Sequence, residues 1–263
     1  MGGLLKNKYR KRRVIWTLVV TGLFAGLVLF NPDAWQMVYF SDIVDGVKNL
    51  FGSSANADDF DAVPSSVAMD ENAPKASEVL EKLEVKGRAP KTGYSRDQFY
   101  DDWPKENGCN LRQRILKRDF GETAVLANDN CTVISGKFVE PYTGEEVEFK
   151  EKSEISKGIQ IDHIVALSDA WQKGAQYKTK DIRFQIATDP LNLVAADASA
   201  NMQKSDGDAA TWLPKNKSFR CQYVARQISV KYKYELWVTE SEKNAMKQVL
   251  SKCPEERAVG VNL

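Results

Sequence analysis

The feature that most restricts the fold of this chain of 263 residues is an uncharged apolar run near its start, residues 14–30. Six positive charges and no negative ones occur in residues 1–13, directly before this run. As a helix the run would span roughly 25 Å, near the lower limit for crossing a bilayer. Because basic flanks stay in the cytoplasm, the pattern predicts a transmembrane helix at residues 14–31, with the rest of the chain exported.

The same segment also has features of a secretory signal, so two outcomes stay open. A signal core usually holds about 7–15 apolar residues and is soon followed by a small-residue cleavage site. This core is longer and no such site follows at once. We therefore expect a membrane-anchored protein, with secretion after cleavage as the alternative. The acidic composition of residues 51–74 predicts that residues 32–75 are a juxtamembrane segment and a flexible linker.

Four cysteines and a single histidine restrict the chemistry further. No CxxC pair occurs among the cysteines, which are Cys109, Cys131, Cys221 and Cys253. The absence of this spacing excludes zinc ribbons and thioredoxin-like motifs. Export favours two disulfides, and sequence proximity favours Cys109–Cys131 and Cys221–Cys253 among the three possible pairings. The lone His163 excludes a zinc site built from several histidines. The net charge of +1 excludes a strongly basic nucleic-acid coat protein.

The patterns of a folded domain extend over residues 76–254, which leaves residues 255–263 as a C-terminal tail. Residues 76–85 predict a short helix or strand, and residues 137–149 predict a hairpin that turns at Thr143-Gly144. Apolar spacing predicts further helical segments at residues 96–103, 110–120, 218–236 and 241–253. The predicted fold class is α+β, with more helix than strand.

Polar residues of different chemical types gather between residues 159 and 206. The alternation around residues 159–163 predicts a strand that carries Asp162 and His163, and residues 189–197 predict a second short strand with Asn192 at its start. A helix that carries Asn201 and Lys204 should follow, because Asp197 and Ser199 are possible caps.

This set of residues favours metal-assisted hydrolysis of a phosphodiester. Histidine is the natural base near neutral pH, and an amide such as that of Asn192 can orient the imidazole through the ring or the backbone. Asp162 and Asn201 offer hard oxygen ligands, which suit Mg²⁺. Lys204 is the candidate for a phosphate contact.

The segments DHIVAL, DPLNLVA and NMQKSDGDAATWLP resemble the HNH (His-Me finger, ββα-metal) nuclease family. They are most similar to the subgroup that forms the C-terminal domain of GmrSD-type restriction enzymes and occurs alone in exported bacterial proteins. Flanking segments, from GYSRDQF to Cys253, extend the similarity over about residues 76–254. The resemblance implies a ββα-metal nuclease core within a mostly helical domain.

The same resemblance assigns roles to individual residues. His163 matches the general base, Asp162 a metal ligand and Asn192 the central Asn, while Asn201 stands where many members have a last His. The implied site has only oxygen ligands, which argues against tight zinc binding. It favours one divalent cation, Mg²⁺, with Mn²⁺ or Ca²⁺ as alternatives.

Substrate contacts are expected from the basic run of residues 215–233, which has no acidic residue and interleaved aromatics. Arg220 and Arg226 are its candidates for phosphate contacts, and a solvated helix face with core aromatics is the alternative. DNA is favoured over RNA by family analogy alone, with weak sequence preference. The competing function is a membrane-anchored, non-catalytic protein that binds nucleic acid or a partner. No protein partner is implied.

Overall fold

The structure is a computed structural model that describes residues 72–261, which lie in the second of the chain's two units, residues 57–263. The predicted cytoplasmic segment at residues 1–13, the membrane helix at residues 14–31 and most of the predicted linker lie outside the described residues. Within residues 72–261, no helix has the length and apolar character needed to cross a bilayer. The anchor at residues 14–31 stays a prediction.

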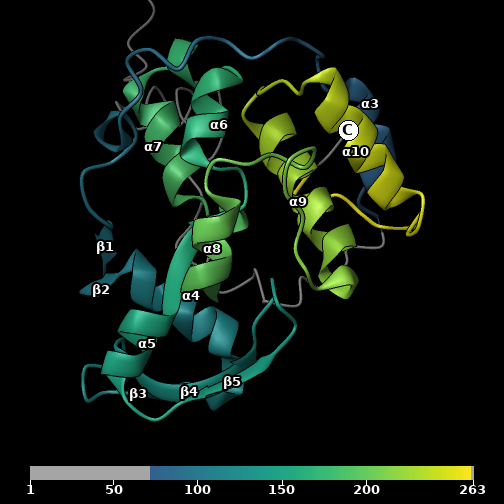
Figure 1. Ribbon diagram of the computed structural model, residues 1–263. Coiled ribbons are helices and arrows are strands. Elements are labelled where there is room, and N and C mark those ends of the chain that lie inside the picture. Colours follow the sequence, from purple (N-terminus) through teal and green to yellow (C-terminus); the bar gives the residue numbers. More distant parts are fainter. Residues whose placement is uncertain (1–71, 262–263) are drawn as a thin grey trace, which may run out of the picture. The chain divides into compact units, whose positions relative to one another are not determined.

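Helices hold more residues than strands do, and small sheets connect them, which confirms the predicted mixed class (Figure 1). The helices are α3 (Ala76–Lys82), α4 (Leu111–Phe120), α5 (Lys152–Gly158), α6 (Leu167–Gln172), α7 (Lys180–Thr188), α8 (Ala198–Lys204), α9 (Arg220–Lys233) and α10 (Glu240–Leu250). Short 3₁₀ turns occur at Arg96–Gln98, Gly121–Thr123, Ala175–Tyr177, Pro190–Asn192 and Lys217–Phe219.

The strands of the described region form small antiparallel sheets. They are β1 (Lys105–Glu106) with β2 (Cys109–Asn110), then β3 (Val125–Leu126), β4 (Val133–Val139) and β5 (Glu146–Phe149), and finally β6 (Ile159–His163) with β7 (Leu193–Asp197). The pairing of β4 with β5 confirms the predicted hairpin. Gly144 has φ 80° in its turn, a conformation that favours glycine.

Strands β6 and β7 continue directly into α8, in the order strand, strand, helix that the sequence predicts. Ile159 pairs with Asp197 and His163 pairs with Leu193, so His163 lies at the end of β6 beside the beginning of β7. The carboxylate of Asp197 then accepts a hydrogen bond from the backbone N–H of Ala200 at 2.8 Å. This contact caps α8 and fixes its start at the end of β7.

Apolar side chains cover the β6–β7 sheet on both sides. Val194 and Ala196 of β7 join a core with α3, α9 and α10, which lie side by side in Figure 1. Leu193 and Ala195 point the other way, into a core formed with α4, α5 and the β4–β5 hairpin. A further core joins α6 and α7 to the segment before β1. The sheet is therefore held by packing on both of its faces.

Both disulfides form as predicted. Cys109 is bonded to Cys131, and Cys221 is bonded to Cys253, with Cα–Cα distances of 5.5 and 6.3 Å. The first bridge ties the start of α4 to the loop before β4. The second ties the start of α9 to the segment after α10.

Two predictions about chain segments need correction. The helix expected at residues 96–103 is a single 3₁₀ turn, because Phe99 and Tyr100 are buried in the α6–α7 core and Pro104 disfavours a helical residue before it. The tail expected at residues 255–263 belongs to the fold as far as residue 261. Ala258 and Val261 are buried, and the N–H of Ala258 donates to the carbonyl of Pro74 at 2.9 Å.

Candidate active site

A pocket of about 330 Å³ opens beside the end of β6. Its lining comes from residues 91–96, β6, the start of α6, and α8 with the turn after it. Asp162, His163 and Asn201 all line it, so the structure brings the predicted base and both predicted metal ligands to one place. Other polar lining residues are Lys91, Tyr94, Arg96, Gln160, Ser168 and Asp206.

His163 is buried, with 5% of its surface exposed, and one ring nitrogen has a defined partner. Its Nε2 lies 3.0 Å from the backbone carbonyl of Ala187. A carbonyl only accepts, so we assign the proton to Nε2, which leaves the lone pair of the neutral ring on Nδ1. The ring of Trp103 is stacked on the imidazole at a centroid distance of 6.0 Å and an angle of 10°.

Burial also keeps the imidazole neutral. It lowers the pKa of His163 from 6.5 to about 3, and the positive charge of Arg96 acts in the same direction, while the hydrogen bond to Ala187 opposes both. The ring is therefore unprotonated at neutral pH. The neutral ring has a lone pair for a proton, although a pKa of about 3 makes it a weaker base than an exposed histidine.

Asn192 is fully buried and connects the strand end to α7. Its Oδ1 accepts from the N–H of Val165 at 2.8 Å, and its Nδ2 donates to the carbonyl of Ile186 at 2.9 Å. Ile186 is the neighbour of Ala187, whose carbonyl accepts the hydrogen bond from Nε2 of His163. The structure therefore links Asn192 to the imidazole through the backbone, one of the two routes considered from the sequence, and its role stays a prediction.

The carboxylate of Asp162 has two close partners. Lys204 Nζ lies 2.8 Å from its Oδ2 and 3.1 Å from its Oδ1, and Tyr142 donates its hydroxyl proton to Oδ2. Lys204 also donates to the carbonyl of His163 at 2.7 Å. Its buried ammonium thus ties the end of α8 to β6, whereas the sequence predicted a phosphate contact.

Asn201 lies on α8 over the same side of β6. Its Nδ2 donates to Oε1 of Gln160 at 2.8 Å, and both residues line the pocket. Within residues 72–261, Oδ1 of Asn201 has no hydrogen-bond donor. This oxygen and the carboxylate of Asp162 are the two predicted ligands that the pocket presents to a hard cation, and the carboxylate-bearing Asp206 also lines it.

The two arginines predicted to contact substrate differ in position. Arg226 is buried on α9, where its guanidinium donates to the carbonyls of Leu191 and Leu193 at 2.8 Å each. Burial lowers its pKa to about 10. Arg226 thus holds the turn before β7 and cannot reach a phosphate from this position. Arg220 is partly exposed at the start of α9, where it donates to the carbonyl of Pro214 at 2.7 Å.

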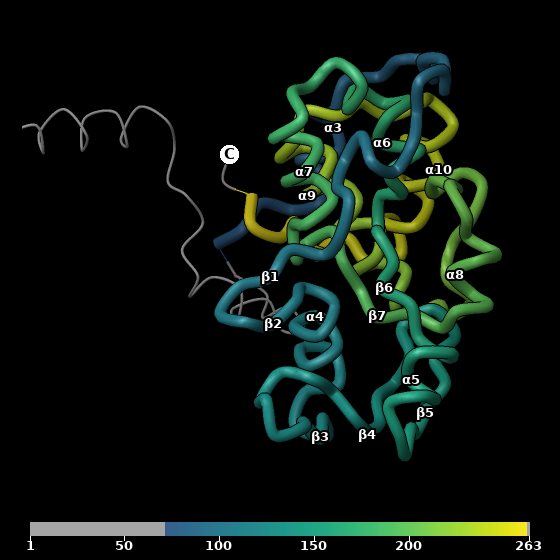
Figure 2. The backbone as a smooth tube through the Cα atoms, turned by 90° about the vertical axis from the view of Figure 1, so that its left-hand side faces the viewer, coloured from purple at the N-terminus to yellow at the C-terminus, as the bar shows by residue number. Residues whose placement is uncertain are grey.

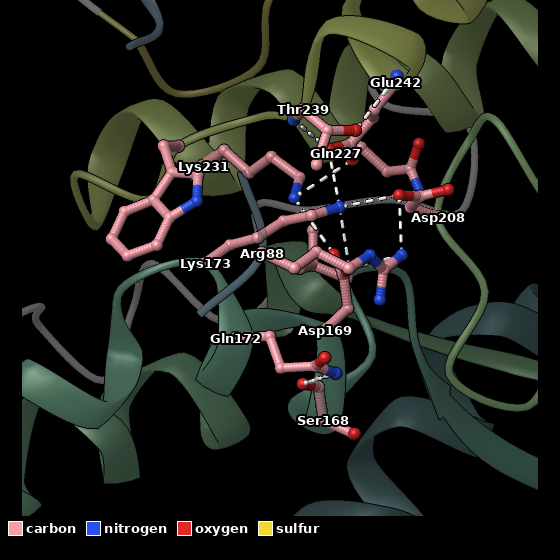
Figure 3. Close-up of polar contacts among 12 residues, drawn as sticks. Arg88, Ser168, Asp169, Gln172, Lys173, Asp208, Gln227, Lys231, Thr239 and Glu242 are labelled. Carbon is pink, nitrogen blue, oxygen red and sulfur yellow. Dashed lines mark hydrogen bonds and ion pairs between the residues drawn. The ribbon is translucent and has the colours of Figure 1, made fainter. Parts of the chain in front are cut away.

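Behind the pocket lies a cluster of buried charges, drawn in Figure 3. Lys173 Nζ lies 2.7 Å from Asp169, 2.8 Å from Asp208 and 2.6 Å from Glu242. Lys231 lies 3.1 Å from both Asp169 and Glu242, whose charges raise its pKa although burial opposes this. Asp169 follows Ser168, and Asp208 follows shortly after Asp206, so the cluster fixes two segments that line the pocket.

The sequence analysis missed Arg96, Lys91, Gln160 and Tyr142 as neighbours of the predicted site. Arg96 lies within the segment GYSRDQF, but nothing in that segment assigns it to the site, because it lies far before β6 in the chain and approaches it only after folding. Gln160 is the exception, since its position two residues before Asp162 on a strand places both on one face.

These features define a disulfide-bonded mixed α/β protein whose pocket contains a neutral imidazole, a carboxylate and an amide, a donor set typical of enzymes that activate water. Residues 111–249 match the family described as GmrSD restriction endonucleases, C-terminal domain, and the chain belongs to this family. An "Uncharacterized secreted protein" of Arthroderma benhamiae is 35% identical over 198 residues, 73% of this chain and 93% of the relative. No solved structure matches the chain.

The comparisons confirm the GmrSD part of the resemblance and do not confirm the rest. The matched family is a nuclease family by its description, whereas the HNH subgroup is not confirmed. The exported bacterial group is not confirmed either, because the relative named above is fungal.

Proposed function

We propose that the chain is a metal-dependent endonuclease that hydrolyses phosphodiester bonds, with a ββα-metal core formed by β6, β7 and α8. The observation that carries the proposal is that His163, whose neutral imidazole is hydrogen-bonded through Nε2 to the carbonyl of Ala187, lines the same pocket as Asp162 and Asn201. The membership in the GmrSD C-terminal family supports the same reaction class.

The side chains of the pocket fit one divalent cation of the kind that prefers oxygen ligands. Asp162 and Asn201 would hold it, with water molecules as the remaining ligands, because Mg²⁺ commonly keeps several waters. Asp162 retains lone pairs beside Tyr142 and Lys204, since a carboxylate has about four acceptor directions. Elsewhere in residues 72–261, the grouped side chains of metal-ligand type are Cys221, Cys253 and Glu256. The two cysteines form a disulfide, so their sulfurs are not thiolate ligands. We propose Mg²⁺ as the cation, with Mn²⁺ or Ca²⁺ as alternatives.

His163 takes the proton of the attacking water at Nδ1 and becomes charged during the step. The carbonyl of Ala187 stabilises that charge by accepting from Nε2, and Asn192 keeps this carbonyl in place through its neighbour Ile186. Trp103 restrains the ring from one face. A bound dication supplies Lewis-acid stabilisation of the phosphate charge and of the leaving oxygen.

We propose DNA as the substrate, with weak sequence preference, on family analogy. Arg220 stays a candidate contact because it is partly exposed, whereas the buried Arg226 is not one. Export of the domain is supported by its two disulfides and by the secreted relative. Attachment through residues 14–31, with the nuclease domain outside the cytoplasm, completes the proposal.

The test is incubation of the purified full-length protein with plasmid DNA and with RNA, in Mg²⁺ and then in EDTA. We expect cleavage in Mg²⁺, no cleavage in EDTA, and a fall of about 10²–10⁴-fold in turnover for His163→Ala, the usual contribution of a general base. Binding of DNA without any cleavage would instead support a non-catalytic binding protein. Near-normal turnover by His163→Ala would refute the mechanism even if the wild type cleaves.

A further inference from the structure

The pocket is completed by a segment that precedes the matched family residues 111–249. This segment runs from α3 past α6 and down to β1 (Figure 2). Lys91, Tyr94 and Arg96 from this segment line the pocket together with His163. The site thus includes two cations that lie outside the family match.

These two cations differ in their partners. Lys91 lies 2.9 Å from the carboxylate of Asp206, which neutralises it. Arg96 is exposed, and no carboxylate lies within ion-pair distance of it in residues 72–261. Its Nε donates to the hydroxyl of Tyr100 at 3.0 Å, and Nη2 donates to the same oxygen. A guanidinium has five N–H donors, so the others are free for a ligand.

The charges around the pocket do not cancel once the buried Lys204, which pairs with Asp162 but does not line the pocket, is included. Asp162 is paired with Lys204 and Asp206 with Lys91, whereas Arg96 is uncompensated. A dication at Asp162 and Asn201 would add further positive charge. A lining of this kind favours an anion.

Tyr100 places this positive charge next to the base. Its hydroxyl holds Arg96, and its ring lies 6.1 Å from the imidazole of His163, centroid to centroid. Tyr100 is itself buried, with 6% of its surface exposed, so its position is fixed by packing. An anion bound to Arg96 would consequently lie beside the water that His163 activates.

We propose that Arg96 binds the scissile phosphate directly and stabilises the negative charge that develops on its oxygens during hydrolysis, with Tyr100 as its positioning residue. This inference rests on the proposed nuclease function. An arginine suits the task because its planar fork donates two hydrogen bonds to one phosphate, a geometry that lysine lacks. Arg96 then completes the site from a segment that precedes the matched residues 111–249.

The test compares Arg96→Ala, Arg96→Lys and Tyr100→Phe in the full-length protein, with Lys117→Ala as the control. Lys117 is an exposed cation on α4 and does not line the pocket. We expect kcat/KM on a DNA duplex in Mg²⁺ to fall by about 10²–10³-fold for Arg96→Ala, by analogy with removal of one oxyanion donor. Arg96→Lys and Tyr100→Phe should lose less, and Lys117→Ala should match the wild type.

A second readout separates phosphate binding from a structural effect. In the His163→Ala background, Arg96→Ala should weaken binding of a labelled DNA duplex and reduce the steepness of its salt dependence. Thermal unfolding should be unchanged, because Arg96 is exposed. Equal cleavage by Arg96→Ala and Lys117→Ala would overturn the role of Arg96 and leave the nuclease function standing. A wild-type protein that cleaves no nucleic acid would overturn the proposed function and this inference with it.

Discussion

Lowering the pH from 7 to 5 should destabilise this protein through His163. In the unfolded chain the imidazole binds a proton near its ordinary pKa of 6.5, whereas the folded protein leaves it neutral down to about pH 3. Between these values the unfolded state binds more protons than the folded state does. The contribution of His163 to stability is therefore fully present above pH 6.5 and is lost as the pH falls.

The size of the effect follows from the difference between pH 5 and the unfolded pKa. One pKa unit corresponds to about 1.4 kcal/mol, so the loss at pH 5 is about 2 kcal/mol, and at pH 7 it is close to zero. The exact folded pKa hardly matters at pH 5, provided that it lies well below 5. Screening by solvent is small, because only 5% of the side chain is exposed.

Urea unfolding of the wild type and of His163→Gln at pH 7 and pH 5 measures this difference. Carboxylates titrate in both proteins, so their contribution cancels and the wild type should lose about 2 kcal/mol more than the variant. His163 is the only histidine, so the NMR signal of one imidazole reports the folded pKa directly. An imidazole that titrates near pH 6.5, or equal losses in the two proteins, would refute the reasoning.

Four further substitutions test the placement of the other residues. Lys204→Met should lower the free energy of unfolding by about 3–5 kcal/mol, since it leaves a buried carboxylate without its cation; a loss below 1 kcal/mol would contradict the pairing. Asn192→Ala should lower turnover without changing the Mg²⁺ concentration for half-maximal rate, and a shifted Mg²⁺ dependence would make it a ligand instead. Arg226→Met should destabilise the fold and leave the salt dependence of DNA binding unchanged, whereas Arg220→Ala should reduce that dependence; the reverse pattern in the binding assay would argue against both positions.

Local patterns in the sequence predict much of the fold. The alternation of apolar residues locates β6, and the turn residues around Gly144 locate the β4–β5 hairpin. The order of strand, strand and helix between residues 159 and 204 also follows from local signals. The disulfide pairs follow from proximity alone, because short loops favour neighbouring cysteines.

Contacts between distant segments could not be predicted in this way. The partner of His163 Nε2 is the backbone carbonyl of Ala187, and no residue type reveals a backbone partner. Charged residues were expected at the surface, yet Lys204, Arg226 and Lys231 are buried with specific partners. Burial of a charge depends on a partner from another element, and sequence periodicity carries no information about that partner.

The buried charge cluster explains why the site needs more than the β6–β7–α8 unit. Lys173 connects Asp169 at the start of α6, and Asp208 after α8, to Glu242 on α10 (Figure 3). Glu242 is itself fixed at the start of α10, because it exchanges hydrogen bonds with Thr239 in a capping box. Removing one member would leave a buried charge unpaired and would release both pocket walls together. The two pocket-lining segments next to Asp169 and Asp208 therefore depend on α10, which lies about 80 residues after His163 in the chain.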